Sequence, residues 1–145
     1  MDSDIFSILP TLTFSTPPVV LEIGAANGMD TKKIFDCLKP SEYFAFEPDP
    51  RNISTLKSVL ALTCKDVQLF QCAIGGFTSE APFNSSTGWN PHFECEHTLS
   101  GSLKTPKKHI TAFPHCEFKD KINVRLIRFD DFIDLFSIPQ IGFIW

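Results

Sequence analysis

The stretch VVLEIGAANG, residues 19–28, decides the class of fold. Its first five residues are apolar apart from Glu22, which is typical of a strand that a parallel sheet buries on both faces. Gly24 and Gly28 predict a tight loop after this strand, because glycine adopts backbone angles that other residues avoid. The apolar spacing of residues 31–38 then predicts a helix. A strand, a tight loop and a helix in this order are the first unit of an α/β fold.

Two more strands are predicted along the chain, with short connections between the elements. Residues 43–46 and 67–74 have the character of strands, and the apolar spacing of residues 53–60 predicts a helix between them. Asp49 is a suitable cap for this helix, and Pro50 is a suitable first residue. The order of strand, helix, strand, helix and strand predicts a parallel sheet with right-handed crossovers.

The regular alternation ends at residues 77–118, which contain four prolines and many serines and threonines. We expect a long excursion there, with one or two short strands, for instance around residues 98–103. After the excursion, the alternation of residues 122–128 predicts a strand. Residues 130–136 then predict a short helix with acidic residues at its start, and residues 141–145 predict another buried strand.

The composition is that of one folded domain, which we place at residues 19–145 after a lead-in segment, residues 1–18. A chain of this length buries roughly 70% of the surface that its unfolded form exposes, and its fifteen phenylalanines predict a Phe-rich core. The net charge of −4 argues against a nucleic-acid partner, which needs a dense basic face. No apolar run reaches the roughly 20 residues of a membrane span. The acidic start lacks the basic segment of a secretory signal, so we expect a cytoplasmic protein.

The first loop and the acid that ends the second predicted strand together indicate a nucleoside site. Glu47 stands roughly 20 residues after Gly24, where a carboxylate can accept hydrogen bonds from the two hydroxyls of a ribose. A dinucleotide loop needs a glycine where this chain has Ala26. Glu22 adds negative charge beside the loop, which disfavours a phosphate and suits a cation. These features favour S-adenosylmethionine, a nucleoside with a positive sulfonium and no phosphate, over NAD.

Three strand-end motifs of the chain resemble those of FkbM-type class I methyltransferases. They are VLEIGAANG at residues 20–28, FAFEPDP at residues 44–50 and CAIG at residues 72–75. The later segments RFDDF, residues 128–132, and IGFI, residues 141–144, resemble the Leu-Asp-Asp-Phe and fourth-strand segments of the same family. The resemblance implies a Rossmann-like methyltransferase sheet that is mostly parallel. It also implies an enzyme that transfers a methyl group from S-adenosylmethionine to a hydroxyl of a small-molecule or glycan acceptor.

Carried over residue by residue, the resemblance implies a set of cofactor-binding residues at the strand ends. They are Glu22, Gly24, Ala25, Asn27, Gly28, Glu47, Ala73 and Ile74. The residues of the first loop would frame the methionine part of the cofactor, and Asn27 would order that loop. Glu47 would hold the ribose, while Ala73 and Ile74 would lie against the adenine.

The excursion contains the remaining candidates for a functional role. His97 is a candidate for the base that removes the acceptor proton, because the excursion would cover the acceptor. Residues 100–102 are expected to line the pocket, and the basic residues 104–108 to form a solvated loop tip. The histidines and cysteines of the excursion form a cluster in the sequence. Their spacing matches no common set of metal ligands, so we expect no metal site. This cluster comprises His92, His97, His109, His115, Cys95 and Cys116.

Two alternatives to an active methyltransferase stay open from the sequence. One is a catalytically inactive nucleoside-binding fragment, and the other is an NAD-dependent Rossmann enzyme. The family continues its fourth strand into an aspartate and then into further strands and helices, whereas this chain ends at Trp145. We therefore expect a sheet that is incomplete at its C-terminal side, and a truncated chain that is poorly soluble or oligomeric alone.

Overall fold

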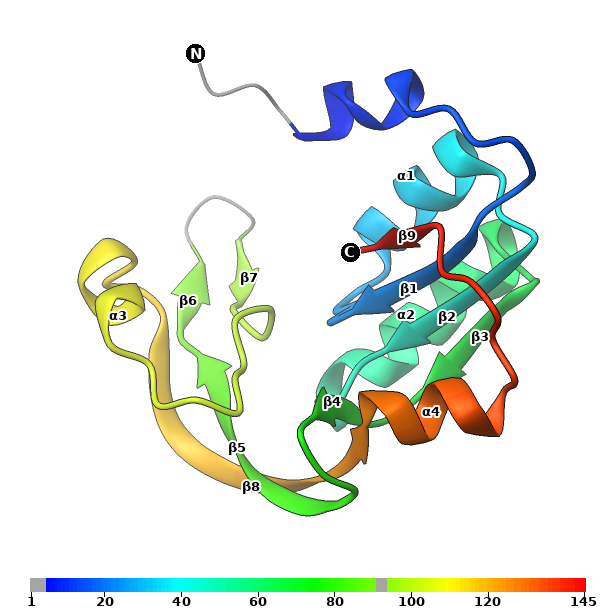
Figure 1. Cartoon of the computed structure of the whole chain (residues 1–145). Coiled ribbons are helices and arrows are strands. Elements are labelled where there is room, and N and C mark those ends of the chain that lie inside the picture. Colours follow the sequence, from blue (N-terminus) through cyan, green and yellow to red (C-terminus); the bar gives the residue numbers. More distant parts are fainter. Residues whose placement is uncertain (1–4, 91–93) are drawn as a thin grey trace.

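A four-stranded parallel sheet is the centre of the computed structural model, which describes residues 5–90 and 94–145 (Figure 1). Its strands lie in the order β3-β2-β1-β9. Their bounds are Val19–Ile23 for β1, Glu42–Phe46 for β2, Val67–Phe70 for β3 and Phe143–Ile144 for β9. The predicted α/β class and the parallel direction of the strands are therefore confirmed. The last predicted strand is shorter than expected, and it lies beside β1.

Helices cover both faces of this sheet. Helix α1, Met29–Leu38, and helix α2, Pro50–Thr63, pack on one face, and helix α4, Phe129–Leu135, packs on the other. Successive strand residues point to opposite faces, so one strand contributes to both layers. In β1, Val20 packs toward α1 and α2, while Leu21 packs toward α4.

Helix α2 begins where the sequence predicts. Asp49 is its cap, since the Asp49 carboxylate accepts a hydrogen bond from the Arg51 amide (3.0 Å), and Pro50 is its first residue. Helix α1 begins two residues before the predicted start, directly after Gly28, whose φ is +82°.

The core beneath α4 is rich in phenylalanine, as the composition predicts. Phe44 and Phe46 of β2 and Phe132 of α4 are fully buried. Their rings meet edge to face, with centroids 5.3 Å apart for Phe44 and Phe132 and 4.7 Å apart for Phe46 and Phe132. Phe70 and Phe136 extend this cluster. The aromatic packing attaches α4 firmly to the sheet.

The predicted third strand, residues 67–74, is in fact two strands of different sheets. The pairing with β2 ends with β3. The chain then turns, where the Cys72 amide donates to the Phe70 carbonyl (3.0 Å), and continues as β4, Ala73–Gly75. Strand β4 then pairs in parallel with β8, Glu117–Arg128. The run of apolar residues through the turn hides this change of partner from the sequence, because pairing is a tertiary property.

The excursion at residues 77–118 is built differently from the expectation. Its first part is a long strand, β5, Ser79–Thr87, which pairs antiparallel with β8 to form a ribbon that extends away from the central sheet (Figure 1). The strand expected around residues 98–103 is absent, and only Ser102 forms an isolated bridge with Asn84. The sequence did not indicate β5 because it contains Pro82 and a run of four small polar residues without apolar alternation.

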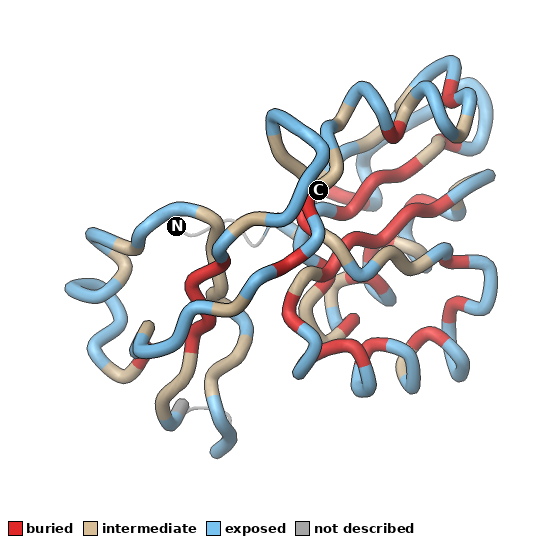
Figure 2. Tube along the Cα trace, turned by 90° about the horizontal axis from the view of Figure 1, so that it is seen from below, coloured by how far each residue is buried: buried red, intermediate tan, exposed pale blue. Residues whose placement is uncertain are grey.

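Short elements complete the chain. The far end of the ribbon holds β6, Trp89–Asn90, β7, Cys95–Glu96, and α3, Lys108–Ala112. The lead-in segment contains two single turns of 3-10 helix, η1, Ile5–Ser7, and η2, Leu9–Thr11. Buried residues concentrate along the central strands, while most residues at the far end of the ribbon are exposed or half-buried (Figure 2). Among the described residues, no helix has the length and apolar character that crossing a membrane requires.

Gly28 offers a test of the tight packing between the first loop and α2. A Cβ atom at Gly28 would lie 2.8 Å from Leu56 Cδ1, and φ is +82°. We therefore expect Gly28→Ala to lower the free energy of unfolding by about 2–4 kcal/mol, measured by chemical denaturation. Gly24→Ala is the control, because φ is +97° there and nothing lies within 4 Å of the added atom. It should cost only about 1–2 kcal/mol, and an equal loss in the two variants would contradict the proposed clash with Leu56.

Candidate cofactor-binding site

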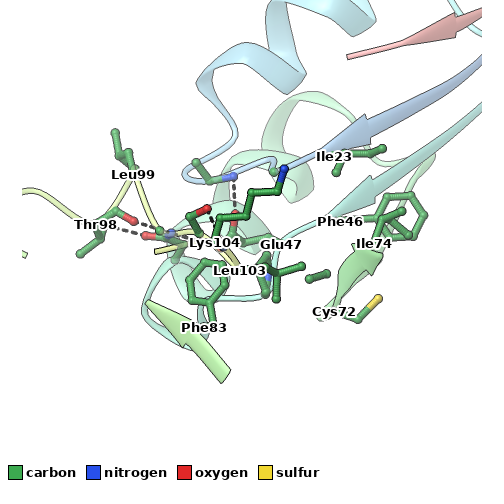
Figure 3. A pocket seen from close by; sticks show the side chains of 17 residues that line it. Ile23, Phe46, Glu47, Cys72, Ile74, Phe83, Thr98, Leu99, Leu103 and Lys104 are labelled. Carbon is green, nitrogen blue, oxygen red and sulfur yellow. Dashed lines mark hydrogen bonds between the residues drawn. The ribbon is translucent and has the colours of Figure 1, made fainter. Parts of the chain in front are cut away.

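A pocket of about 310 Å³ lies at the carboxyl ends of the central strands (Figure 3). This edge of an open α/β sheet is where ligands bind. Three strand ends form the floor and walls of the pocket, and residues of the excursion form its cover. The strand ends contribute Ile23, Gly24, Ala26, Phe46, Glu47, Pro48, Cys72, Ala73 and Ile74. The prediction that Gly24, Glu47, Ala73 and Ile74 gather at one site therefore agrees with the lining of this pocket.

The first loop is held against the end of β2 by backbone hydrogen bonds. The amides of Gly24 and Ala25 both donate to the Phe46 carbonyl, at 2.8 and 2.9 Å. The loop turns sharply because φ is +97° at Gly24 and +49° at Ala26. Asn27 Oδ1 accepts a hydrogen bond from the Met29 amide (3.2 Å), so its side chain orders the start of α1.

Glu47 connects three parts of the chain at the edge of the pocket. Its Oε2 accepts from the Ala26 amide (2.8 Å), and its Oε1 accepts from the Asp49 amide (2.8 Å) and the Asn52 side chain (3.3 Å). Only 4% of the residue is exposed. Burial raises the pKa of Glu47, although these three hydrogen bonds act in the opposite direction. A carboxylate has about four acceptor positions, so the carboxylate retains acceptor capacity toward the pocket.

Glu22 precedes the first loop and Gly28 ends it, and neither residue lines the pocket. The Glu22 side chain is fully buried on the face of β1 that meets α1, and its Oε2 accepts a hydrogen bond from the Tyr43 hydroxyl (2.9 Å). Burial raises the pKa of Glu22 to about 7, while the nearby hydroxyls of Thr31 and Tyr43 oppose this shift. Glu22 therefore supports the first loop from behind, and its expected contact with the methionine part of a cofactor stays a prediction.

The cover of the pocket is the segment of residues 98–104, called the cover segment below. Asn52 of α2 attaches its start, since Asn52 Nδ2 donates to the Thr98 carbonyl (3.2 Å) and the Thr98 hydroxyl donates to Asn52 Oδ1 (2.7 Å). Asn84 of β5 attaches its end, since Asn84 Nδ2 donates to the carbonyls of Ser102 (3.0 Å) and Lys104 (3.1 Å). The cover segment is thus held by hydrogen bonds from two separate elements.

Small residues allow the cover segment to lie close to the ribbon. A Cβ atom at Gly101 would lie 2.3 Å from the Phe83 ring, so this position requires glycine. Gly101 and Ser102 line the pocket, as expected for residues 100–102. Lys104 was expected at a solvated loop tip, but it also lines the pocket, where Figure 3 shows its side chain among those of the lining residues.

An ion pair at the cap of α2 attaches the ribbon to the central sheet. Arg51 Nη2 lies 2.6 Å from Asp49 Oδ2 and donates to the Ser86 carbonyl of β5 (2.8 Å). Burial alone would raise the pKa of Asp49, but the hydrogen bonds from Arg51 outweigh it and hold that pKa below its usual value. The sequence indicated Asp49 as a helix cap and did not indicate this second role, because Ser86 lies far along the chain.

A second hollow of about 570 Å³ adjoins the pocket and shares Gly24, Ala26 and Leu99 with it. It lies between the start of α1 and the end of β7. Its other lining residues are Ala25, Asn27, Met29, Asp30, Lys33, Cys95, Glu96 and His97. Burial lowers the pKa of His97, and the neighbouring His115 and His109 act in the same direction. His97 lines the second hollow and does not line the first pocket. His92, the remaining predicted candidate, lies outside the described residues.

Comparison with known proteins supports the resemblance that the strand-end motifs predict. The chain is similar to the 2-O-methyltransferase NoeI of Sinorhizobium fredii (strain NBRC 101917 / NGR234), with 30% identity over 128 residues. The match covers 88% of this chain and 51% of NoeI, so the chain spans about half the length of this curated relative. A scan against protein-family models finds no match.

Among solved structures, the chain matches the crystal structure of methyltransferase FkbM from Methylobacillus flagellatus KT. The TM-score is 0.49 and the sequence identity is 17%. The match covers 87% of this chain and 26% of that one.

The buried carboxyl of Glu22 predicts a pH dependence of stability. Its pKa is about 7 in the folded chain and 4.5 ordinarily, so the folded state binds the proton more tightly. The stabilisation of the folded state by this proton is fully present below pH 4.5 and is lost as the pH rises to about 7. Relative to Glu22→Gln, which cannot ionise, the wild-type chain should lose on the order of 3 kcal/mol of unfolding free energy across this range.

The measurement is urea denaturation of both chains at several pH values between 5 and about 8. Other titrating groups are common to the two chains, so the difference isolates Glu22. A constant difference over this range would show that Glu22 ionises with an ordinary pKa.

Proposed function

We propose that the chain binds S-adenosylmethionine and serves its transfer of a methyl group to a hydroxyl of a small-molecule or sugar acceptor. The observation that carries the proposal is the Glu47 carboxylate, buried at the edge of a pocket formed by the strand ends and hydrogen-bonded to the first loop. The similarity to NoeI, whose name states 2-O-methyl transfer, supports the reaction class. The chain spans about half of NoeI, so methyl transfer and the hydroxyl acceptor are both part of the proposal.

The lining of the first pocket fits an adenosine. Three internal hydrogen bonds leave the Glu47 carboxylate able to accept from a ribose hydroxyl, and such charged hydrogen bonds are stronger than neutral ones. Ala73 and Ile74 of β4 form an apolar wall that suits the flat face of adenine. The volume of about 310 Å³ lies at the lower end of the range for small-molecule pockets.

The second hollow fits the methionine end of the donor and the approach of an acceptor. It continues from the first pocket past Gly24 and Ala26, and its walls carry the carboxylates of Asp30 and Glu96. These negative groups suit the ammonium and sulfonium charges of the donor, and Lys33 on the same wall suits its carboxylate. The positions of both hollows support one extended ligand that crosses the first loop.

The residues of this chain act in the proposed reaction by positioning. When bound, S-adenosylmethionine supplies a methyl group on a positive sulfur, which makes the methyl carbon reactive. Glu47 and the first loop would hold the donor, and the cover segment would keep water from the adenosine. Correct placement of two reacting groups supplies a large part of the acceleration of such transfers.

Glu47 provides the test of the cofactor site. A partly buried carboxylate–ribose interaction is worth about 2–3 kcal/mol, so Glu47→Gln should weaken the binding of S-adenosylhomocysteine roughly 30–150-fold in calorimetry. Glu42→Gln is the matched control, because Glu42 is exposed at the start of β2, outside the pocket. The affinity of the Glu42→Gln chain for S-adenosylhomocysteine should equal that of the wild-type chain.

Thermal melting of both variants checks that the first loop is intact, since Glu47 also holds the Ala26 amide. An unchanged affinity in a folded Glu47→Gln chain would remove Glu47 from the site. A parallel titration with NAD separates the two cofactors, and tighter binding of NAD than of S-adenosylhomocysteine would overturn the proposal. Binding of S-adenosylhomocysteine without methyl transfer to a panel of hydroxyl acceptors would indicate the inactive nucleoside-binding alternative.

A further inference from the structure

Three potential metal ligands from separate segments meet at the far end of the ribbon. His97 follows β7, His109 lies in α3, and Cys116 directly precedes β8. One ligand atom from each side chain, an imidazole nitrogen or the sulfur, lies within 4.8 Å of the other two. The sequence spacing did not predict this cluster, because its members are 12 and 7 residues apart and only the fold of the excursion brings them together.

The type of ligand indicates which metal suits the cluster. A thiolate and two imidazoles are the ligands that Zn²⁺ prefers, with bonds of about 2.3 Å to sulfur and about 2.0 Å to nitrogen. Around a tetrahedral ion these bond lengths place the ligand atoms about 3.5 Å from one another. The ligand atoms lie within 4.8 Å of one another, so they are roughly 1 Å or less from the spacing that a bound zinc ion requires.

An unsatisfied nitrogen in the cluster points independently to a ligand. Nε2 of His109 is buried and has no hydrogen-bond partner among the described residues. Leaving a buried polar atom unpaired costs about 1–3 kcal/mol, so such atoms are rare in native proteins. Cys116 in the same cluster is 1% exposed. A metal bond would satisfy the His109 nitrogen and would use a thiol that has no contact with bulk water.

The far end of the ribbon also lacks the apolar core that would hold it together. Helix α3 has no buried residue, and Ile110 and Phe113 are 50% and 49% exposed. Small units with little buried apolar surface commonly use a structural metal for stability. A metal bound to three segments here would connect β7, α3 and β8 in one step.

We propose that His97, His109 and Cys116 bind Zn²⁺ and that the ion holds the cover segment in place. His97 immediately precedes Thr98, whose hydrogen bonds with Asn52 attach the cover segment to α2. Fixing His97 therefore fixes the start of the cover. A metal-bound imidazole is no longer a base, so this role replaces the catalytic role that the sequence suggested for His97. His97 also lines the second hollow, but the proposal stands independently of methyl transfer because its test measures bound metal and not activity.

The test is the metal content and spectrum of the purified 145-residue chain. After removal of metal by a chelator, the chain should bind one Zn²⁺, measured by competition with a colorimetric chelator. Co²⁺ in its place should give the charge-transfer absorption of a thiolate–cobalt bond. Cys116→Ser should lose this absorption, and both Cys116→Ser and His109→Gln should lose stoichiometric Zn²⁺.

Matched controls come from the same part of the chain. Cys95→Ser removes an exposed thiol of the excursion, and His115→Gln removes a histidine whose ring centroid lies 5.6 Å from that of His97. Both controls should keep one Zn²⁺ and the thiolate absorption. Equal Zn²⁺ binding by Cys116→Ser and the wild-type chain would overturn the proposal, and so would loss of the thiolate absorption in Cys95→Ser alone.

Thermal melting of the wild-type chain keeps the test decisive if a variant does not fold. The midpoint should rise when Zn²⁺ is added to the metal-free chain, and it should not rise with Mg²⁺, which prefers oxygen ligands. A wild-type chain that binds no Zn²⁺ and melts at the same temperature with and without the ion would refute the site.

Discussion

The Glu47 carboxylate holds together the edge of the sheet at which the proposed site is built. One oxygen accepts from the Ala26 amide in the first loop, and the other accepts from the Asp49 amide and from Asn52 at the start of α2. These contacts join the ends of two neighbouring parallel strands and the beginning of a helix. The loop backbone has positive φ at Gly24, Ala26 and Gly28, and a buried acceptor opposite it stabilises this conformation.

The contacts of Asn52 extend this arrangement to the excursion. Asn52 touches Glu47 on one side and Thr98 on the other, so the floor and the cover of the pocket share a single side chain. Asp49 and Arg51 make a second connection to β5 through Ser86. The pocket is therefore closed by polar contacts between α2 and the ribbon.

The first half of the fold could be predicted from sequence because its signals are local. The apolar run before Gly24 indicated β1, and Asp49 with Pro50 indicated the start of α2. The second half was predicted less well, since β5 lacks the alternation of apolar and polar residues that is usual in a strand. Its stability comes from pairing with β8, which no local pattern reveals. The division of residues 67–74 between two sheets was missed for the same reason.

The sequence by itself determined the parallel α/β core, the ends of the first two strands and the gathering of Gly24 and Glu47 at one edge, while the resemblance to FkbM-type methyltransferases added Ala73 and Ile74. This was possible because strand direction and loop chemistry follow from short-range patterns. Only the tertiary structure decided that Glu22 lies behind the loop, that residues 98–104 cover the pocket, and that His97, His109 and Cys116 meet. These outcomes depend on which face of a strand is buried and on contacts between distant segments. Such contacts arise from the packing of the whole chain, which spacing along the sequence does not encode.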